Sequence, residues 1–378
     1  MKYFFSFFLL SMLQFFSSQV TFKIIALPEN TPKDAQFFMA SSLNNWNPAD
    51  KSFEFKKDEN GNYTLKISKI DEDFEYKITQ GSWDFAEGDA QGNASSNRKF
   101  SPQTDGNLIN LEILSWQKPL EKANTLSPNV SVLSENFNIP QLKTTRKIWI
   151  YLPPDYATSG KKYPVVYMED GQNLFNDATS FSGEWKVDET LNAEYAQKKT
   201  DAIVIGIENG GAERLNEYSP WKNSKYGGGK GDLYADFLAN TLKPYIDKHY
   251  RTLSQPKYTA LIGSSMGGLI SFYAGVKYPN TFGKLGIFSP SFWFAKQDLI
   301  FYLRKNTKKL KNSKIYFYAG LKESDDMVSN IKKAEIELIK QGVPAKNIFT
   351  KFNPDGTHSE SYWSREFGQS FEWLFENN

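Results

Sequence analysis

The pattern of hydrophobic and polar residues changes about a third of the way along the chain. From residue 20 to about 116, short alternating runs such as VTFKIIAL and NYTLKISK are separated by polar turns such as NGN at 60–62. Alternation of this kind is typical of half-buried strands, and no convincing amphipathic helix interrupts it. The pattern predicts a small all-β sandwich over residues 20–116.

A different pattern follows a stretch that reads as a linker. Residues 117–130, QKPLEKANTLSPNV, contain two prolines and few apolar residues, which predicts the linker. After it, apolar runs such as YPVVYMED and DAIVIGIEN alternate with helical patterns such as SNIKKAEIELIKQG. Strands that alternate with helices predict an α/β domain over residues 131–378, with a mostly parallel sheet and helices on both faces.

The first residues read as a targeting segment. Lys2 precedes an apolar run over residues 3–16, and Ser17 and Ser18 supply small residues near a cleavage site. The run is shorter than the ~20 residues that span a bilayer, so residues 1–19 are predicted to be a signal peptide. A buried first strand or helix is the alternative. We expect an exported protein, periplasmic or extracellular, without a membrane span.

Composition narrows the chemistry. The chain has 45 Lys+Arg and 43 Asp+Glu, a formal net charge of +2, which argues against nucleic acid or another polyanion as a partner. With no cysteine there is no disulfide, no thiolate metal site and no cysteine nucleophile. Two histidines make a multi-histidine metal site hard to build, so we expect no metal and no cofactor.

One short motif points to nucleophilic catalysis. The sequence GSSMG at 263–267 fits G-x-S-x-G, follows an apolar strand pattern and opens a helical one, as a nucleophile elbow does. Small flanking residues allow a strained serine backbone, and the helix N-terminus offers amide groups to a developing oxyanion. The motif predicts Ser265 as the nucleophile. A purely structural glycine turn is the alternative.

The serine needs a base, and the chain offers two histidines. His249, in YIDKHYRT, precedes the serine at the polar end of a helical pattern, which is an ordinary surface position. His358 follows the serine in the loop NPDGTHSESYW. Because the order along an α/β-hydrolase chain is serine, acid, histidine, we predict His358 as the base. A structural histidine is the alternative.

The acid and the oxyanion donors are less sharply defined. The acid should follow the strand pattern KIYFYAG, and the next residues supply three carboxylates, Glu323, Asp325 and Asp326. Each could instead be a favourable charge at a helix N-terminus. A second oxyanion donor should come from the loop after an earlier strand, where DGQ ends at Gln172. We predict that its amide acts with that of Met266.

These motifs, taken in order, resemble the Putative esterase family of α/β-hydrolases, which includes enterochelin esterases, esterase D, and the feruloyl and acetyl xylan esterases of carbohydrate esterase family 1. The likeness covers about residues 131–378 and runs through YMEDGQNLF, IVIGIENGGAERLNEYSPW, LKPYIDKHYRT, GSSMGG, SPSFW and GTHSESYW. In the family the acid lies three residues after the glycine that ends its strand. Gly320 then implies Glu323, although many relatives carry Asp there.

Family position also implies residues that contact the substrate. They are Arg214, Glu217, Trp293 and Trp363. A salt bridge and core aromatic residues are the alternative for these four.

The first domain resembles the starch-binding and glycogen-binding modules of carbohydrate-binding families 20 and 48. The matching stretches are ASSLNNWNPADKS and FEYKITQGSWDFAEGDAQGNASSNRKF. The resemblance implies an immunoglobulin-like sandwich in which Trp46 and Trp83 stack on the sugars of an α-glucan. The alternative is a module that no longer binds sugar and packs only against its neighbour.

Together the motifs and resemblances predict an exported serine esterase. It would cleave an acyl group of the acetyl or feruloyl type from a carbohydrate through a Ser-His-Glu triad and an acyl-enzyme. A siderophore trilactone of the enterochelin type is the alternative substrate. Acyltransferases and glycan-binding proteins with an inactive hydrolase domain are alternatives of another class, and the intact Ser265 and His358 argue against the second.

Overall fold

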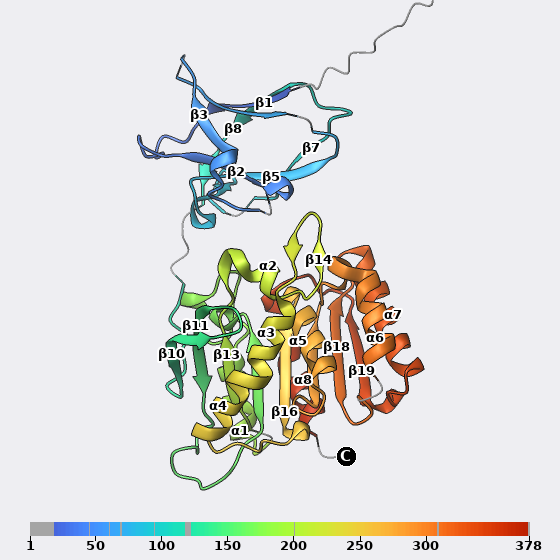
Figure 1. Ribbon diagram of the computed structural model, residues 1–378. Coiled ribbons are helices and arrows are strands. Elements are labelled where there is room, and N and C mark those ends of the chain that lie inside the picture. Colours follow the sequence, from blue (N-terminus) through green and yellow to red (C-terminus); the bar gives the residue numbers. More distant parts are fainter. Residues whose placement is uncertain are drawn as a thin grey trace, which may run out of the picture. The chain divides into compact units, whose positions relative to one another are not determined.

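The computed structural model describes residues 19–44, 46–59, 61–68, 70–93, 95–117, 122–199, 201–307 and 310–376. The predicted signal peptide lies outside these ranges except for Gln19, as do residues 118–121 of the expected linker. The chain divides into two compact units, residues 1–121 and 122–378, which we describe separately (Figure 1). Among the described residues, no helix has the length and apolar character that crossing a membrane requires.

The first unit is a sandwich built from one strongly bent sheet. Its strand order is β7-β5-β2-β3-β4-β1-β8. The strands are β1 (Gln19–Ala26), β2 (Phe37–Ser41), β3 (Glu54–Lys57), β4 (Tyr63–Ser68), β5 (Phe74–Thr79), β7 (Arg98–Phe100) and β8 (Leu108–Glu112). A separate ribbon joins β6 (Glu87–Gly88) to β9 (Ser115–Trp116), and 3-10 turns cover 42–44, 51–53 and 83–85.

The core of this unit shows why the sheet closes on itself. Strand β3 pairs with β2 through its first half and with β4 through its second half, so the two ends of the sheet can face each other. Phe22 of β1 packs against Phe74, Tyr76 and Phe100 of β5 and β7, with ring centroids 5.4–6.1 Å apart. Aromatic side chains on alternate strand positions therefore fill the space between the two layers.

The second unit is built on an eight-stranded sheet of order β10-β11-β13-β12-β16-β17-β18-β19. The first three strands pair antiparallel, and the others pair parallel. Their bounds are β10 (Val130–Ile139), β11 (Thr144–Tyr151), β12 (Val165–Glu169), β13 (Ile203–Ile207), β16 (Thr259–Ser264), β17 (Lys284–Phe288), β18 (Lys314–Gly320) and β19 (Ile348–Asn353). Every residue of β12, β13, β16 and β17 is buried, which explains their continuous apolar runs.

Helices cover both faces of this sheet, as predicted (Figure 1). They are α1 (Val187–Ala196), α2 (Arg214–Glu217), α3 (Gly231–Phe237), α4 (Lys243–His249), α5 (Met266–Lys277), α6 (Lys296–Asn306), α7 (Asp325–Lys340) and α8 (Glu360–Phe375). A π-helical turn, Leu238–Leu242, joins α3 to α4, and β14 (Lys222–Asn223) pairs with β15 (Gly227–Gly228). The 3-10 turns cover 171–173, 177–179, 211–213, 256–258, 292–295 and 345–347.

Successive residues of a central strand point to opposite faces of the sheet. Tyr167 of β12 belongs to one hydrophobic cluster with residues of α3 to α7, whereas its neighbour Met168 belongs to a second cluster with residues of α1 and α8. This is the alternation that a pleated strand imposes on a sheet covered on both sides.

The loops that follow the parallel strands meet at one edge of the sheet. A glycine pair brings two of them into contact, because a Cβ on Gly320 would lie 2.1 Å from the carbonyl oxygen of Gly356. The amide of Lys322 also donates a hydrogen bond to that oxygen at 3.0 Å. The loops after β18 and β19, which carry Glu323 and His358, are thus held backbone against backbone.

Candidate active site

Ser265 is the single residue between β16 and α5, and its backbone conformation is strained. Its φ of 56° and ψ of −124° belong to a region that non-glycine residues rarely adopt. The Ser265 amide donates to the carbonyl of Phe288, and its own carbonyl accepts from the amide of Ser291, both at 2.9 Å. These bonds to the last residue of β17 and to the loop after it hold the turn, and the Ser265 side chain is half-buried at the edge of the sheet.

The flanking glycines are required by close packing. A Cβ on Gly263 would lie 2.5 Å from the carbonyl oxygen of Gly267, so any side chain there would push α5 away from β16. A Cβ on Gly267 would lie 3.0 Å from Asp170 Oδ2. The elbow is therefore pressed both against its own strand and against the loop that follows β12.

His358 and Glu323 are joined directly. His358 Nδ1 lies 2.7 Å from Glu323 Oε2, and the glutamate side chain is 1% exposed. Glu323 Oε1 accepts two further hydrogen bonds of 2.6 Å, from Ser289 Oγ and from the amide of Gly320. Burial alone would raise the pKa of Glu323, but the bonds from His358, Ser289 and Gly320 outweigh it and lower that pKa. With Nδ1 held in this way, Nε2 is the free ring nitrogen.

Sequence reasoning missed Ser289, which links the acid to the base. Its hydroxyl donates to Glu323 and accepts a 2.9 Å hydrogen bond from Trp363 Nε1. The Trp363 ring packs edge-on against His358, with centroids 5.0 Å apart. Ser289 also has a positive φ of 41°. The only signal for it was its place in the SPSFW stretch.

The other carboxylates of the acid loop lie elsewhere. Asp326 is 58% exposed and forms an ion pair with Lys296, while the side chain of Asp325 is outside the described part. His249 lies at the end of α4, where its Nδ1 is 2.7 Å from the carbonyl oxygen of Tyr245. Within the described ranges, Glu323 is thus the carboxylate that meets His358.

Gln172, predicted as the second oxyanion donor, lies in the loop after β12. Asp170 has a φ of 56° and is fixed by two bonds from Arg214, of 2.7 and 2.8 Å, and one from Asn209 of 2.8 Å. Among the described residues, the amides of Gln172 and Met266 form no backbone hydrogen bond beyond the bonds within helices and strands. Unsatisfied amides at a helix start are available to an anion.

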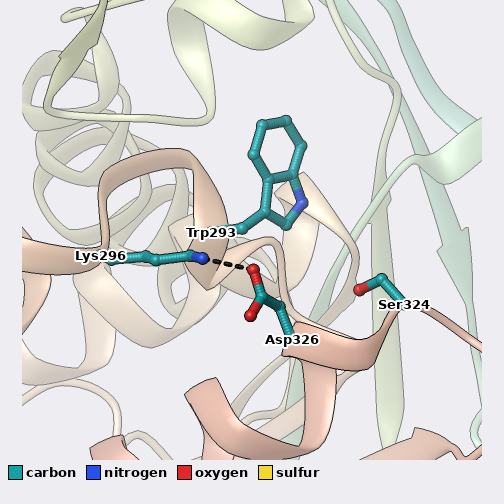
Figure 2. Close-up of a pocket in the computed structure, with 4 residues that line it drawn as sticks. All are labelled: Trp293, Lys296, Ser324 and Asp326. Carbon is teal, nitrogen blue, oxygen red and sulfur yellow. Dashed lines mark hydrogen bonds and ion pairs between the residues drawn. The ribbon is translucent and has the colours of Figure 1, made fainter.

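A pocket of about 410 Å³ lies next to these loops (Figure 2). It is lined by Trp293, Lys296, Ser324 and Asp326. Trp293 follows Ser291 by two residues, Ser324 directly follows Glu323, and the indole is 40% exposed. The pocket therefore borders the loops that carry the acid and the contacts of the serine.

The remaining predicted contact residues occupy different environments. Arg214 is engaged with Asp170, and Glu217, 3% exposed, is paired with Arg146 at 2.7 Å. Trp363 is 3% exposed in the core. These three placements match the salt-bridge and core alternatives stated above, whereas Trp293 is open to a ligand.

Trp46 and Trp83 lie together in the first unit. Their ring centroids are 6.2 Å apart with an interplanar angle of 38°, and both side chains are partly exposed. Trp46 also has a positive φ of 59°. The two rings form a small exposed aromatic pair on loops that follow β2 and β5.

The second unit has the fold of an α/β-hydrolase, with a strained serine at the strand-to-helix turn and a histidine held by a carboxylate at the same sheet edge. The chain belongs to the Putative esterase family, whose model matches residues 139–374. The predicted fold class and family are thereby confirmed, and the protein is an esterase.

Known proteins resemble the chain over one unit or over both. Protein YbbA of Bacillus subtilis (strain 168) is 28% identical over 247 residues, which cover 62% of this chain and 94% of that protein. A ferulic acid esterase structure has a TM-score of 0.52 at 17% identity and covers 65% of this chain and 98% of its own. The enterobactin esterase of Shigella flexneri, solved in the presence of enterobactin, has a TM-score of 0.54 at 16% identity and covers 95% and 92%.

Glu169, at the end of β12, leads to a prediction about pH. It is 2% exposed and accepts a 2.5 Å hydrogen bond from the Tyr234 hydroxyl, and burial raises its pKa to about 8. The native state keeps a proton that the unfolded chain loses above about pH 4.5, so stability falls between about pH 4.5 and 8, by up to roughly 1.4 kcal/mol per pH unit. We expect Glu169→Gln to flatten this decline in urea unfolding measured across that range.

The matched control is Glu135→Gln, because the Glu135 side chain is 63% exposed. It should keep the wild-type pH dependence. An unchanged slope in Glu169→Gln would show that the proton is not held at Glu169.

Proposed function

We propose that the protein is a serine esterase in which Ser265, His358 and Glu323 act as a catalytic triad. The observation that carries this proposal is the 2.7 Å contact between His358 and Glu323 at the sheet edge where the elbow holds Ser265. A histidine fixed through Nδ1 leaves Nε2 to take a proton from a serine hydroxyl.

The reaction follows from these positions. Ser265 Oγ attacks the ester carbonyl as His358 Nε2 takes the hydroxyl proton, and Glu323 stabilises the imidazolium that forms. The amides of Met266 and Gln172 donate to the oxyanion of the tetrahedral intermediate. The intermediate collapses as His358 returns the proton to the leaving alcohol, and water then cleaves the acyl-enzyme by the same steps.

The resting position of the serine hydroxyl fits this sequence. Ser265 Oγ is 3.2 Å from Ser291 Oγ. We infer that the hydroxyl exchanges this contact for His358 Nε2 as a substrate enters, since hydrogen bonds of catalytic groups commonly tighten only in the substrate complex.

For the substrate, we propose an ester that carries a ring-shaped group, with an acetyl or feruloyl group on a carbohydrate as the first candidate. The exposed indole of Trp293 in the pocket next to the acid loop supports a planar or sugar ring there. A siderophore trilactone is the second candidate. It is favoured by the enterobactin esterase structure, which spans both units of this chain, whereas the ferulic acid esterase covers about one.

We further propose that the enzyme acts outside the cytoplasm after loss of the signal peptide predicted at residues 1–19. The hydrophobic run behind Lys2 supports this placement.

The triad predicts a specific pattern of kinetic losses. Ser265→Ala and His358→Ala should each lower kcat on p-nitrophenyl acetate by on the order of 10⁶, the loss found in another serine hydrolase, and the double variant should be little worse than either single variant. His249→Ala is the control and should keep wild-type activity. A folded Ser265→Ala protein with wild-type turnover would end the proposal.

The substrate is identified by comparing three esters with the wild-type enzyme. Hydrolysis rates of acetylated xylan, methyl ferulate and an enterobactin-type trilactone should differ strongly, and we expect a carbohydrate ester to react fastest. Preference for the trilactone would establish the second candidate. Acyl groups recovered on an added sugar, rather than as free acid, would identify an acyltransferase.

Substitutions of Glu323 and of the nearby Asp326 test which carboxylate is the acid of the triad. Glu323→Gln should lower turnover by on the order of 10⁴, because the histidine loses the charge that stabilises its protonated form. Asp326→Asn removes an exposed partner of Lys296 and should leave kcat within a small factor of wild type. The reverse pattern would place the acid at Asp326.

The first unit is proposed to bind α-glucan through Trp46 and Trp83. In affinity gels that contain soluble starch or glycogen, the full chain should be retarded, and Trp83→Ala should lose most of that retardation. Phe85, 45% exposed on the same 3-10 turn, offers the matched control Phe85→Ala, which should behave as wild type. Equal mobility of the wild type with and without any α-glucan would leave the aromatic pair a packing feature.

A further inference from the structure

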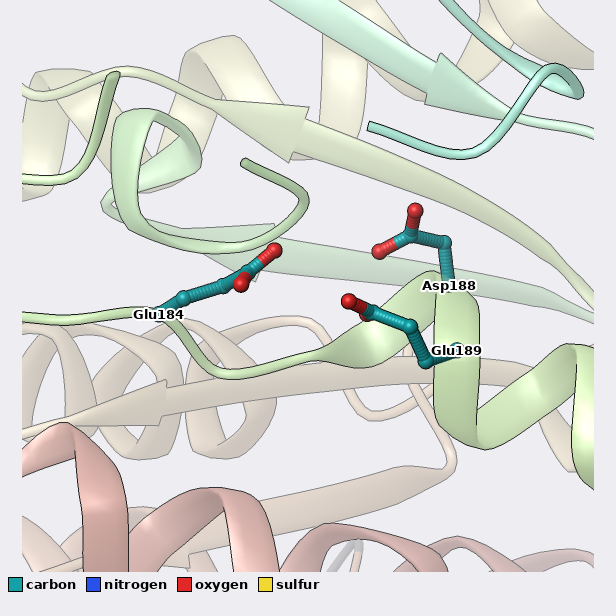
Figure 3. Close-up of side chains that lie close together, drawn as sticks. All are labelled: Glu184, Asp188 and Glu189. Atoms are coloured by element: carbon teal, nitrogen blue, oxygen red, sulfur yellow. The ribbon is translucent and has the colours of Figure 1, made fainter. Parts of the chain in front are cut away.

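A group of three carboxylates lies at the start of α1, outside the proposed catalytic site. Glu184, Asp188 and Glu189 each turn one oxygen toward the others, and these oxygens lie within 4.8 Å of one another (Figure 3). Glu184 is 6% exposed and Asp188 is fully buried. This acidic cluster contacts residues 125–127, which lie in the segment that leads into β10.

The hydrogen bonds of the cluster leave two oxygens without a donor. Both oxygens of Glu184 accept from Thr125 Oγ1 at 3.0 Å, and Asp188 Oδ2 accepts from the amide of Ser127 at 2.9 Å. Asp188 Oδ1 and Glu189 Oε2 are buried and have no partner among the described residues. Figure 3 shows the Asp188 carboxylate directed toward the other two. A buried anionic oxygen without a donor or counter-charge is strongly unfavourable.

The cations of the described chain balance this group only in part, since burial raises the pKa of Glu184 and the nearby Lys186 offsets that rise incompletely. Within the described part of the chain, no lysine, arginine or histidine forms an ion pair with any of the three carboxylates. Their position in the first turn of α1 places Asp188 and Glu189 near a helix N-terminus, which offsets part of one charge. Burial and the neighbouring Asp188 also raise the pKa of Glu189, and a bound positive group would balance the negative charge that remains.

We propose that Glu184, Asp188 and Glu189 form a calcium-binding site. Carboxylate oxygens with no nitrogen or sulfur ligand select a hard cation. Oxygens that lie within 4.8 Å of one another are compatible with calcium–oxygen bonds of about 2.4 Å in a flexible shell. Three protein carboxylates favour calcium over magnesium, because magnesium usually takes one or two carboxylates, keeps several waters and requires strict octahedral geometry. Water would complete the coordination shell.

The position of the site gives the ion a structural role. Thr125 and Ser127, which bond to Glu184 and Asp188, lie in the segment that precedes β10. An ion in the cluster would balance the charges of the Glu184 and Asp188 carboxylates. It would thereby stabilise the hydrogen bonds that connect residues 125–127 to the start of α1. This role does not depend on the proposed triad, so a failure of either proposal leaves the other standing.

The test measures thermal stability of the full chain after removal of divalent ions with a chelator. Calcium chloride should raise the melting temperature of the second unit by on the order of 5 °C at a hundredfold excess over the dissociation constant. Magnesium chloride and sodium chloride at equal ionic strength should raise it much less. Terbium, a calcium probe, should give luminescence excited through tryptophan, and calcium should quench it by competition.

Variants assign the effect to the cluster. Asp188→Asn should abolish both the calcium shift and the terbium signal. Glu189→Gln, at a less buried ligand, should do the same and serves if Asp188→Asn does not fold. Asp298→Asn is the matched control, because Asp298 is an exposed carboxylate in the first turn of α6, and it should respond as the wild type does.

Three results would overturn the proposal. One is a wild-type protein that responds to calcium no more than to sodium. Another is an equal response to magnesium, which would reject calcium as the ion. The third is a calcium response that persists in both Asp188→Asn and Glu189→Gln, which would place calcium binding elsewhere on the chain.

Discussion

The contact between the backbones of Gly263 and Gly267 is the constraint on which the rest of the site depends. With a Cβ position only 2.5 Å from the facing carbonyl oxygen, no residue larger than glycine lets α5 start so close to the end of β16. The serine between them takes a positive φ as a result, and its hydroxyl lies 3.2 Å from that of Ser291. The first amides of α5 are thereby left without acceptors beside the serine hydroxyl. A strained residue persists only where its surroundings fix it, and here two backbone hydrogen bonds, to the end of β17 and to the loop after it, do so.

The order of the parallel strands determines which groups can reach this serine. Strands β16, β17, β18 and β19 are neighbours in the sheet, so their following loops lie side by side at one edge. Those loops supply, in order, the serine, Ser289, Glu323 and His358. The longer side chain of glutamate fits because its Oε1 turns back to the amide of Gly320, three residues earlier, while Oε2 reaches the histidine. The extra methylene relative to aspartate is thus absorbed by a local ring of hydrogen bonds.

Local patterns predicted the parts of this molecule that depend on neighbours in sequence. The apolar runs of the central strands and the strand-to-helix switch at Ser265 are visible in short windows. The choice of Glu323 among three carboxylates came from the family resemblance, through its distance from Gly320. Ser289 and the Arg146–Glu217 ion pair were not predictable, because their partners come from distant segments and a single serine or glutamate carries no periodic signal. The acids in the first turn of α1 carry no pattern that separates them from other helix-start charges, and the folded chain brings Glu184 beside them.

Buried carboxylates in the second unit differ in how their charge is balanced. Arginine or histidine partners balance the charges of Asp170, Glu217 and Glu323. A proton balances Glu169, whose raised pKa keeps it neutral next to the tyrosine hydroxyl. Each of these four carboxylates therefore has either a paired cation or a proton and the hydroxyl of Tyr234. The cluster at α1 has no paired cation among the described residues, and although burial and Asp188 raise the pKa of Glu189, three carboxylates still share a small volume and leave two oxygens without donors. One proton could neutralise only one of the three groups, whereas a divalent cation satisfies the facing oxygens together, and this is why the geometry favours an ion over protonation.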